Sequence, residues 1–122
     1  MARSVGNENA VPERFQDAVV RLDGDAALLR QMAAMTSPDF AGLIADSESA
    51  IRDNDGEAAV RSLHKLKGML STFESDGVVL EIQEMIAAAR KGNVTSAGEH
   101  FRRHRGQIEE LVDVVTQFSQ SS

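Results

Sequence analysis

A histidine followed by a lysine and a glycine is the feature of this sequence best suited to chemistry. The stretch RSLHKLKGMLSTF, from Arg61 to Phe73, places Lys67 three residues and Gly68 four residues after His64. A neutral histidine ring is a nucleophile that is well populated at neutral pH. A phosphoryl group on such a ring carries negative charge and strong acceptor oxygens, which a nearby ammonium group neutralises. The spacing therefore suits a histidine that carries a phosphoryl group, which we take as a hypothesis.

The helical period places this histidine away from the core. At about 100° per residue, one face of a helix through this stretch gathers the apolar side chains Ala59, Leu63, Leu66, Leu70 and Phe73 within about 40° of one direction. His64 points about 140° away from that direction. We expect a single patch on the solvent-facing flank, made by His64, Lys67, Gly68 and Ser71.

Gly68 stands inside the predicted helix, where glycine costs about 1 kcal/mol relative to alanine. Positions four residues apart are neighbours on a helix surface, so the missing side chain clears space beside His64 for a partner protein. The chain has no Gly-rich phosphate loop and no nucleotide-binding motif. Since phosphoryl transfer depends mainly on alignment and charge stabilisation, we expect no cofactor of the chain's own. Mg²⁺ and the acceptor carboxylate are expected on the partner.

The composition limits the class of protein. The chain has 122 residues, which favours one domain, and 42% of them are hydrophobic, which argues against disorder. The absence of cysteine excludes disulfides and thiolate metal sites. The net charge of −6 argues against nucleic acid as a partner. Because we find no bilayer-spanning apolar run and no signal-peptide core, we expect no membrane partner and a cytoplasmic location.

Helical periodicity recurs along most of the chain. The expected helices run from Pro12 to about Leu22, from a cap at Asp23 or Asp25 to Ser37, from Pro38 to about Arg52, from about Gly56 to Phe73, and then along two stretches that follow Gly77 and Gly92. Ser37 is expected to be an N-cap, with Pro38 at the first position of a new helix. Nothing in the sequence indicates a strand.

Long amphipathic helices joined by short turns pack as antiparallel neighbours. The predicted fold is therefore all-α, an antiparallel up-down four-helix bundle with extra N-terminal helical segments. Residues 1–10 are expected to be a flexible N-terminus, and residues 11–120 a single helical bundle domain. A closed bundle of this kind needs no second copy, so we expect a monomer.

The motif H-x-L-K-G, from His64 to Gly68, resembles the core motif of histidine-containing phosphotransfer (HPt) domains. The stretch from Leu22 to Leu29 is similar to the leading helices of that family, and Leu80-Glu81 with Arg90 to Gly92 is similar to its following helix. The resemblance covers about residues 12–118. HPt domains are four-helix bundles that pass phosphoryl groups between receiver aspartates in two-component phosphorelays.

The resemblance implies that the chain is a phosphorelay intermediate, with His64 as the phosphoacceptor, Lys67 as the charge partner of the phosphoryl group and Gly68 as the residue that gives access. The implied partners are response-regulator receiver domains or a hybrid histidine kinase. Gln83 or Glu84 would bond the ring or the phosphoryl group. Docking of the partner is expected at Val60, Lys65, Ser71, Gln83 and Glu84.

Two features depart from the family pattern. The family usually has small residues directly after the glycine, where this chain has Met69 and Leu70. It often has Leu-Gly near the end of the helix, where this chain has Phe73-Glu74. Leu70 points to the predicted core, whereas Met69 lies near the flank and would reshape the docking surface. The departures bear on the identity of the partner more than on the chemistry.

Two other functions fit parts of the same pattern. The bundle would act as a binding module that docks or sequesters a signalling partner without carrying a phosphoryl group, which the bulky Met69 favours. Alternatively, the chain would be the dimerising phosphoacceptor helix pair of a histidine kinase. Such kinases usually have an acidic residue directly after the histidine, where this chain has Lys65. We therefore expect no ATP-dependent kinase activity of its own.

The other two histidines, His100 and His104, lie four residues apart on one helix, a spacing that suits a metal ion. A third ligand is not evident from the sequence, and His104 falls on the apolar stripe of the last helix. We therefore expect packed or partly buried histidines. The arginines between residues 102 and 105 are expected to form local ion pairs with Glu99 and Glu109.

Overall fold

The computed structural model describes residues 11–121, and every regular element in that range is helical. The elements are η1 (Glu13–Phe15), α2 (Gln16–Arg21), α3 (Ala26–Arg52), α4 (Gly56–Leu70), α5 (Val78–Arg90) and α6 (Val94–Gln120). None of these helices is long and apolar enough to cross a membrane. The segment predicted to be a flexible N-terminus, residues 1–10, lies outside the described residues.

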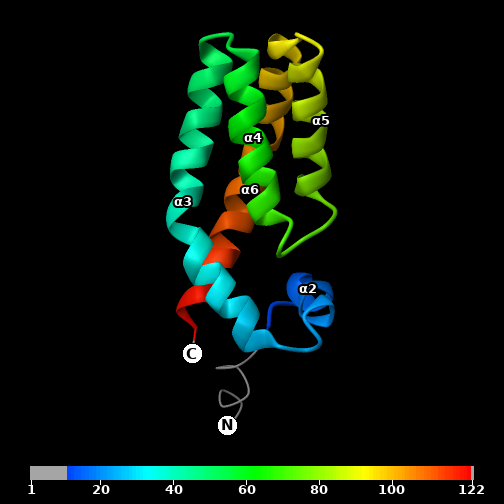
Figure 1. Cartoon of the computed structure of the whole chain (residues 1–122), viewed down its shortest axis with the longest axis vertical. Coiled ribbons are helices and arrows are strands. Elements are labelled where there is room, and N and C mark those ends of the chain that lie inside the picture. The colour runs from blue at the N-terminus through cyan, green and yellow to red at the C-terminus, as the bar shows by residue number, and fades with distance from the viewer. Residues whose placement is uncertain (1–10, 122) are drawn as a thin grey trace.

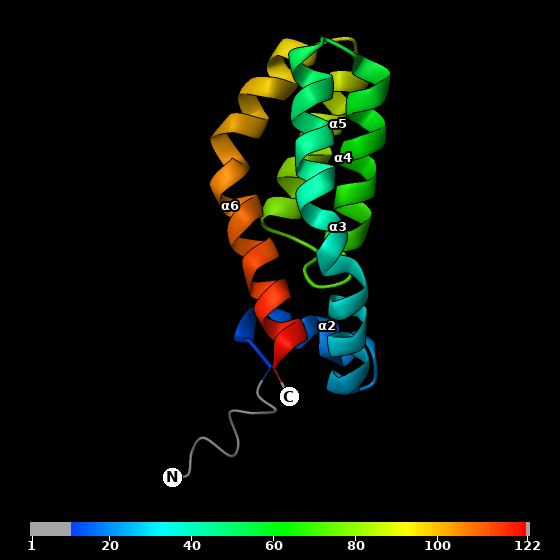
Figure 2. The same cartoon turned by 90° about the vertical axis from the view of Figure 1, so that its left-hand side faces the viewer.

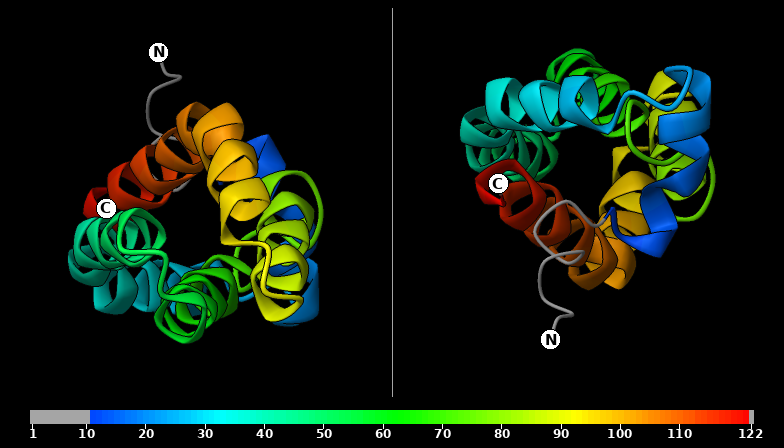
Figure 3. Two further views of the ribbon diagram at one scale, coloured as in Figure 1. Left: turned by 90° about the horizontal axis from the view of Figure 1, so that it is seen from above. Right: turned by 90° about the horizontal axis from the view of Figure 1, so that it is seen from below.

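Helices α3 to α6 run up and down in one bundle (Figure 1). Helix α3 packs against α4 and α6, and α5 packs against the same two helices from the other side. Viewed along its long axis, the bundle surrounds one centre, with α4 and α6 diagonally opposite (Figure 3). The predicted all-α fold, a four-helix bundle with extra N-terminal helical segments, is confirmed.

Polar side chains cap the N-termini of three of the four bundle helices. Asp25, Asp55 and Asn93 each accept a hydrogen bond from the backbone N–H three residues later, at 2.9, 3.1 and 3.1 Å respectively. Such a cap satisfies an N–H group that has no partner within the helix and contributes about 1 kcal/mol. The caps therefore fix where α3, α4 and α6 begin.

Each bundle helix buries one apolar face in a shared core. Burial of apolar surface stabilises the fold by about 25 cal/mol per Å², so each face holds its helix at a defined rotation. The largest fully buried side chains of the four helices are Leu29, Phe40, Leu63, Leu66, Leu70, Ile82, Met85, Ile86, Ile108 and Leu111.

The N-terminal segment covers the end of the bundle that the shorter helices do not reach. Helices α3 and α6 have 27 residues each, whereas α4 has 15 and α5 has 13. At 1.5 Å per residue, α3 exceeds α4 in length by about 18 Å. In Figures 1 and 2, α2 lies beside this overhang. The fully buried Phe15 ring contacts Phe73 and Phe118 there, with ring centroids 5.5 and 5.6 Å apart.

An ion pair anchors the same segment to the turn after α4. Arg14 donates two hydrogen bonds to the Glu74 carboxylate, at 3.0 and 3.3 Å, and the Glu74 side chain is only 11% exposed. The hydrogen bond to Glu74 raises the pKa of the Arg14 guanidinium, an effect that burial opposes. Phe73 and Glu74 are the residues that depart from the family pattern, and here they hold the N-terminal segment in place.

The structure corrects the predicted break at Ser37-Pro38, because α3 continues from Ala26 to Arg52 with Pro38 inside it. Proline lacks the N–H that would bond the carbonyl of Ala34 and usually kinks a helix. Both Ala34 and Pro38 are exposed, so water can reach that carbonyl. Helix α3 changes direction within its cyan part in Figure 1. Burial of Ala33 and Phe40 on either side holds both halves against the bundle.

The predicted end of the fourth helical stretch at Phe73 is also wrong. Helix α4 ends at Leu70, and a tight turn follows in which the Phe73 N–H donates to the Leu70 carbonyl at 2.9 Å. Phe73 lies beyond the end of the helix, but it still fits the apolar spacing because this turn directs its ring into the core. Contact with Phe15, which the sequence pattern does not reveal, keeps the ring there.

Replacing Phe15 by alanine tests whether the N-terminal segment belongs to the core. Phe15→Ala removes a fully buried ring and should lower the free energy of unfolding by about 3–5 kcal/mol. Val20→Ala is the matched control on α2, because Val20 is 72% exposed and its loss should cost under about 0.5 kcal/mol. Urea unfolding of both variants measures the difference, and equal midpoints would show that the segment is not part of the folded core.

Candidate functional site

Helix α4 buries one face and exposes the other. Leu63, Leu66 and Leu70 are fully buried, whereas His64 lies on the exposed face. The Asp55 cap fixes the start of this helix, and its leucines fix its rotation. The prediction that the His64 ring stands outside the hydrophobic seam is confirmed.

His64 makes no hydrogen bond or ion pair with any residue in the range 11–121. The other two histidines differ, because His100 and His104 are half-buried and both contact Glu81. A nucleophile must present a nitrogen lone pair to its substrate, and a partner bond would occupy that nitrogen. Of the three histidines, His64 is therefore the one whose ring nitrogens have no partner within residues 11–121.

Gly68 lies one turn after His64 and faces open space. A Cβ atom placed on Gly68 would meet nothing within 4 Å beyond its chain neighbours and the nearby backbone of its own helix. The fold itself therefore does not require a glycine here, although glycine costs about 1 kcal/mol in a helix interior. The absence of a side chain at this position leaves the surface beside the ring open to an approaching protein.

Three basic side chains line a shallow depression on the surface that also includes His64. They are Lys65 and Arg61 of α4 and Arg90 of α5, and Val60 contributes an apolar wall. Three aspartates, Asp46, Asp53 and Asp55, line the same depression, so its acidic and basic side chains are equal in number. The basic side chains are the ones that would stabilise a phosphate group, which carries negative charge.

Arg61 and Arg90 were not among the site residues predicted from the sequence. Arg61 precedes His64 by three residues, so helical spacing alone contained the signal that the two share a face. Arg90 lies on a different helix, and only the packing of α4 against α5 brings it to the depression. The sequence could not reveal that proximity.

The other predicted residues differ in how they are placed. Lys67 is half-buried on the α4 flank, one turn after His64. Ser71 is half-buried, and its hydroxyl donates to the Lys67 carbonyl at 2.7 Å. Because a hydroxyl has one proton, Ser71 in this state cannot also donate to a phosphoryl oxygen.

Gln83 and Glu84 both lie on α5, where Gln83 is half-buried and Glu84 is exposed. Among the described residues, neither hydrogen-bonds to His64. The Gln83 amide is able to donate to a phosphoryl oxygen, whereas the Glu84 carboxylate would repel one. Of the two, Gln83 is therefore the better suited to assist a phosphorylated ring.

Comparison with known protein families agrees with this geometry. The Hpt domain family matches residues 27–118, a range that runs from the start of α3 almost to the end of α6 and includes His64. The chain belongs to the Hpt domain family. Comparisons with curated proteins and with solved structures found no match.

Membership in the Hpt family places the chain among the phosphotransfer domains of phosphorelays, which work with receiver domains and histidine kinases. The match begins after η1 and α2, so the N-terminal cover lies before the part of the chain that the family describes. The H-x-L-K-G motif, residues 64–68, lies within the matched range and on the helix with the exposed histidine.

Alanine at Gly68 tests whether the fold needs this glycine. Gly68→Ala should raise the free energy of unfolding by about 1 kcal/mol, because it adds helix propensity in open space. Gly98→Ala is the contrasting variant, since its Cβ would lie 2.7 Å from Ile51 Cγ2 and should destabilise the protein by about 1–3 kcal/mol. Thermal and urea unfolding measure both. A loss of stability in Gly68→Ala would contradict the open geometry.

Proposed function

We propose that this Hpt domain is a phosphorelay intermediate in which His64 accepts a phosphoryl group from the aspartate of one receiver domain and passes it to another. The observation that carries the proposal is an exposed imidazole with no hydrogen-bond or ion-pair partner among residues 11–121, on a helix whose opposite face is buried. The family match and the surrounding cations support it.

The proposed transfer from aspartate to His64 needs no cofactor bound to this chain. The unprotonated ring nitrogen of His64 forms a bond to phosphorus while the bond between phosphorus and the aspartyl oxygen breaks. The aspartate leaves as a carboxylate, and the other ring nitrogen keeps its proton. Mg²⁺ would be held by the receiver, and catalysis would come from alignment and charge neutralisation. The reverse reaction delivers the group to a second receiver.

The cations around His64 would stabilise the phosphoryl group once it is on the ring. Lys67 follows the histidine by three residues, a separation at which helical side chains are neighbours. The same depression as His64 is lined by three further cations, Arg61, Lys65 and Arg90. They would attract the negatively charged surface around the phosphorylated aspartate of a receiver domain. Val60 and Met69 are half-buried apolar side chains near this surface, and we propose that they contact the docked receiver.

Replacing His64 tests the proposal directly. Receiver domains from the same genome are phosphorylated and incubated with the chain or with His64→Gln. We expect label on the native chain and none on His64→Gln, because glutamine cannot form the phosphorus–nitrogen bond. The variant should keep its stability within about 0.5 kcal/mol, since the ring is exposed.

Equal label on both proteins, or none on the native chain with every receiver tested, would overturn the proposed function. In that case, a partner that binds the native chain and His64→Gln with equal affinity would identify the chain as a binding module. Incubation of the chain alone with ATP should give no label, because transfer requires a phosphorylated partner.

Substitutions at Lys67 and Gly68 test the roles of charge and access separately. Lys67→Gln should slow phosphoryl transfer by about 10-fold to 100-fold, the effect of losing one hydrogen bond to a charged group. Gly68→Ala should also slow transfer, although it should not unfold the protein. The matched controls are Lys91→Gln, at the end of α5, and Gly106→Ala, on α6 in open space. Both controls should transfer at the native rate, and slowing in them equal to that in the test variants would contradict the assigned roles.

A further inference from the structure

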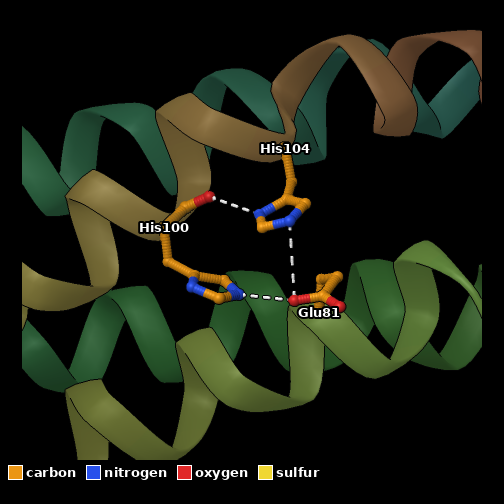
Figure 4. Close-up of side chains that lie close together, drawn as sticks. All are labelled: Glu81, His100 and His104. Carbon is orange, nitrogen blue, oxygen red and sulfur yellow. Dashed lines mark hydrogen bonds and ion pairs between the residues drawn. The ribbon is translucent and has the colours of Figure 1, made fainter.

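A cluster of two histidines and one carboxylate joins α5 to α6 (Figure 4). His100 Nε2 lies 2.8 Å and His104 Nε2 lies 3.5 Å from the same Glu81 oxygen, Oε1. The three side chains are between 16% and 37% exposed, so they are partly shielded yet open to small solutes. Glu81 supplies a third donor atom, which the sequence did not reveal because it comes from a different helix.

The hydrogen bonding of His104 prepares its ring for a metal ion. Its Nδ1 lies 3.0 Å from the carbonyl oxygen of His100. A carbonyl only accepts, so Nδ1 carries the proton in this contact and the lone pair of a neutral ring is on Nε2. Metal-binding histidines usually donate their other ring N–H to a carbonyl or carboxylate in this way, which fixes the ring orientation. In Figure 4, the His104 Nε2 atom points toward Glu81.

The two distances from the Glu81 oxygen to the histidine nitrogens are close to those of a tetrahedral site. Zinc binds histidine nitrogen and carboxylate oxygen at about 2.0–2.2 Å, which places neighbouring donors about 3.3 Å apart. The separations from the Glu81 oxygen are 2.8 and 3.5 Å, and one donor atom from each residue lies within 4.8 Å of the others. For an ion to bind, the proton that His100 Nε2 donates to Glu81 would move to Nδ1 of the same ring or to solvent, and the side chains would adjust around the ion.

We propose that Glu81, His100 and His104 form a binding site for a divalent transition-metal ion of the zinc type. Two imidazoles and one carboxylate favour zinc and its neighbours in the first transition row over Mg²⁺ and Ca²⁺, which prefer oxygen ligands. Three protein ligands leave the fourth tetrahedral position to water.

A bound ion would connect α5 to α6 at the surface of the bundle. His100 and His104 belong to α6, and Glu81 belongs to the first turn of α5. The two histidines lie on α6, diagonally opposite α4, and none of the three ligands lines the depression that includes His64. The proposal therefore does not depend on the proposed phosphotransfer function.

Titration of the full chain with Zn²⁺, after removal of any affinity tag, tests the site. Isothermal titration calorimetry should give one ion per chain with a dissociation constant in the micromolar range or tighter. Zn²⁺ should raise the midpoint of thermal unfolding, because it binds the folded arrangement of ligands. Mg²⁺ should not raise it. Co²⁺ should give the visible absorption of a tetrahedral site with nitrogen and oxygen ligands.

Ligand variants separate this site from general surface binding. His100→Gln and His104→Gln should each weaken Zn²⁺ binding by about 10-fold or more. Loss of a residue that only hydrogen-bonds to a metal ligand already costs about 10-fold to 100-fold in affinity, and loss of a ligand should cost at least the lower value. Glu81→Gln should weaken it as well. The matched control is His64→Gln, which removes the remaining histidine of the chain and should bind Zn²⁺ as the native chain does.

Circular dichroism confirms that each variant is folded before titration. His100→Gln is the safest of them for this purpose, because it does not alter the hydrogen bond from His104 to the backbone. No heat of binding and no thermal shift with Zn²⁺ in the native chain would overturn the proposal. Equal affinity in the native chain and in folded His100→Gln would do the same.

Discussion

Leu63, Leu66 and Leu70 are fully buried between the other helices, and this burial fixes the rotation of α4. The rest of the proposed site depends on that constraint. Each leucine that leaves water contributes about 1.5–3 kcal/mol, so turning α4 by one residue would expose several of them at a cost comparable to the stability of a domain. His64, adjacent to Leu63 in the chain, is consequently held toward solvent. A nucleophile in a fixed direction needs little reorganisation when a partner docks.

The bundle also assigns different environments to its three histidines. His64 is exposed and has no partner among the described residues, whereas His100 and His104 face Glu81 across the seam between α5 and α6. These environments follow from helix rotation, because the same residue type lies on an outer flank in α4 and beside a neighbouring helix in α6. The histidine proposed to react is therefore distinguished by its position in the fold and by the residues around it.

Helical periodicity was sufficient to predict the fold class, the buried leucines and the exposure of His64. It failed where tertiary contacts decide the structure. Pro38 remains inside α3 because Ala33 and Phe40 bury the helix on both sides of it. Helix α4 ends at Leu70, yet Phe73 is still buried because Phe15, far away in the chain, packs against it.

The positions of Arg90 and Glu81 beside their respective sites likewise depend on which helices are neighbours. A single sequence gives the faces of each helix, but it does not give the residues that face one another across two helices. The expected local pairing of the basic run is confirmed for Arg105, which donates to Glu109 at 3.1 Å. Arg105 also pairs with Glu48 of α3, a contact that only the packed bundle brings about.

Mapping of the phosphorylated residue tests the central claim most directly. After transfer from a phosphorylated receiver, the chain is digested and analysed by mass spectrometry under alkaline conditions that preserve phosphohistidine. The account predicts one phosphoryl group, located on His64, with His100 and His104 unmodified. A phosphoryl group on His100 or His104 with His64 unmodified would contradict the claim that exposure on the α4 flank selects the reactive histidine.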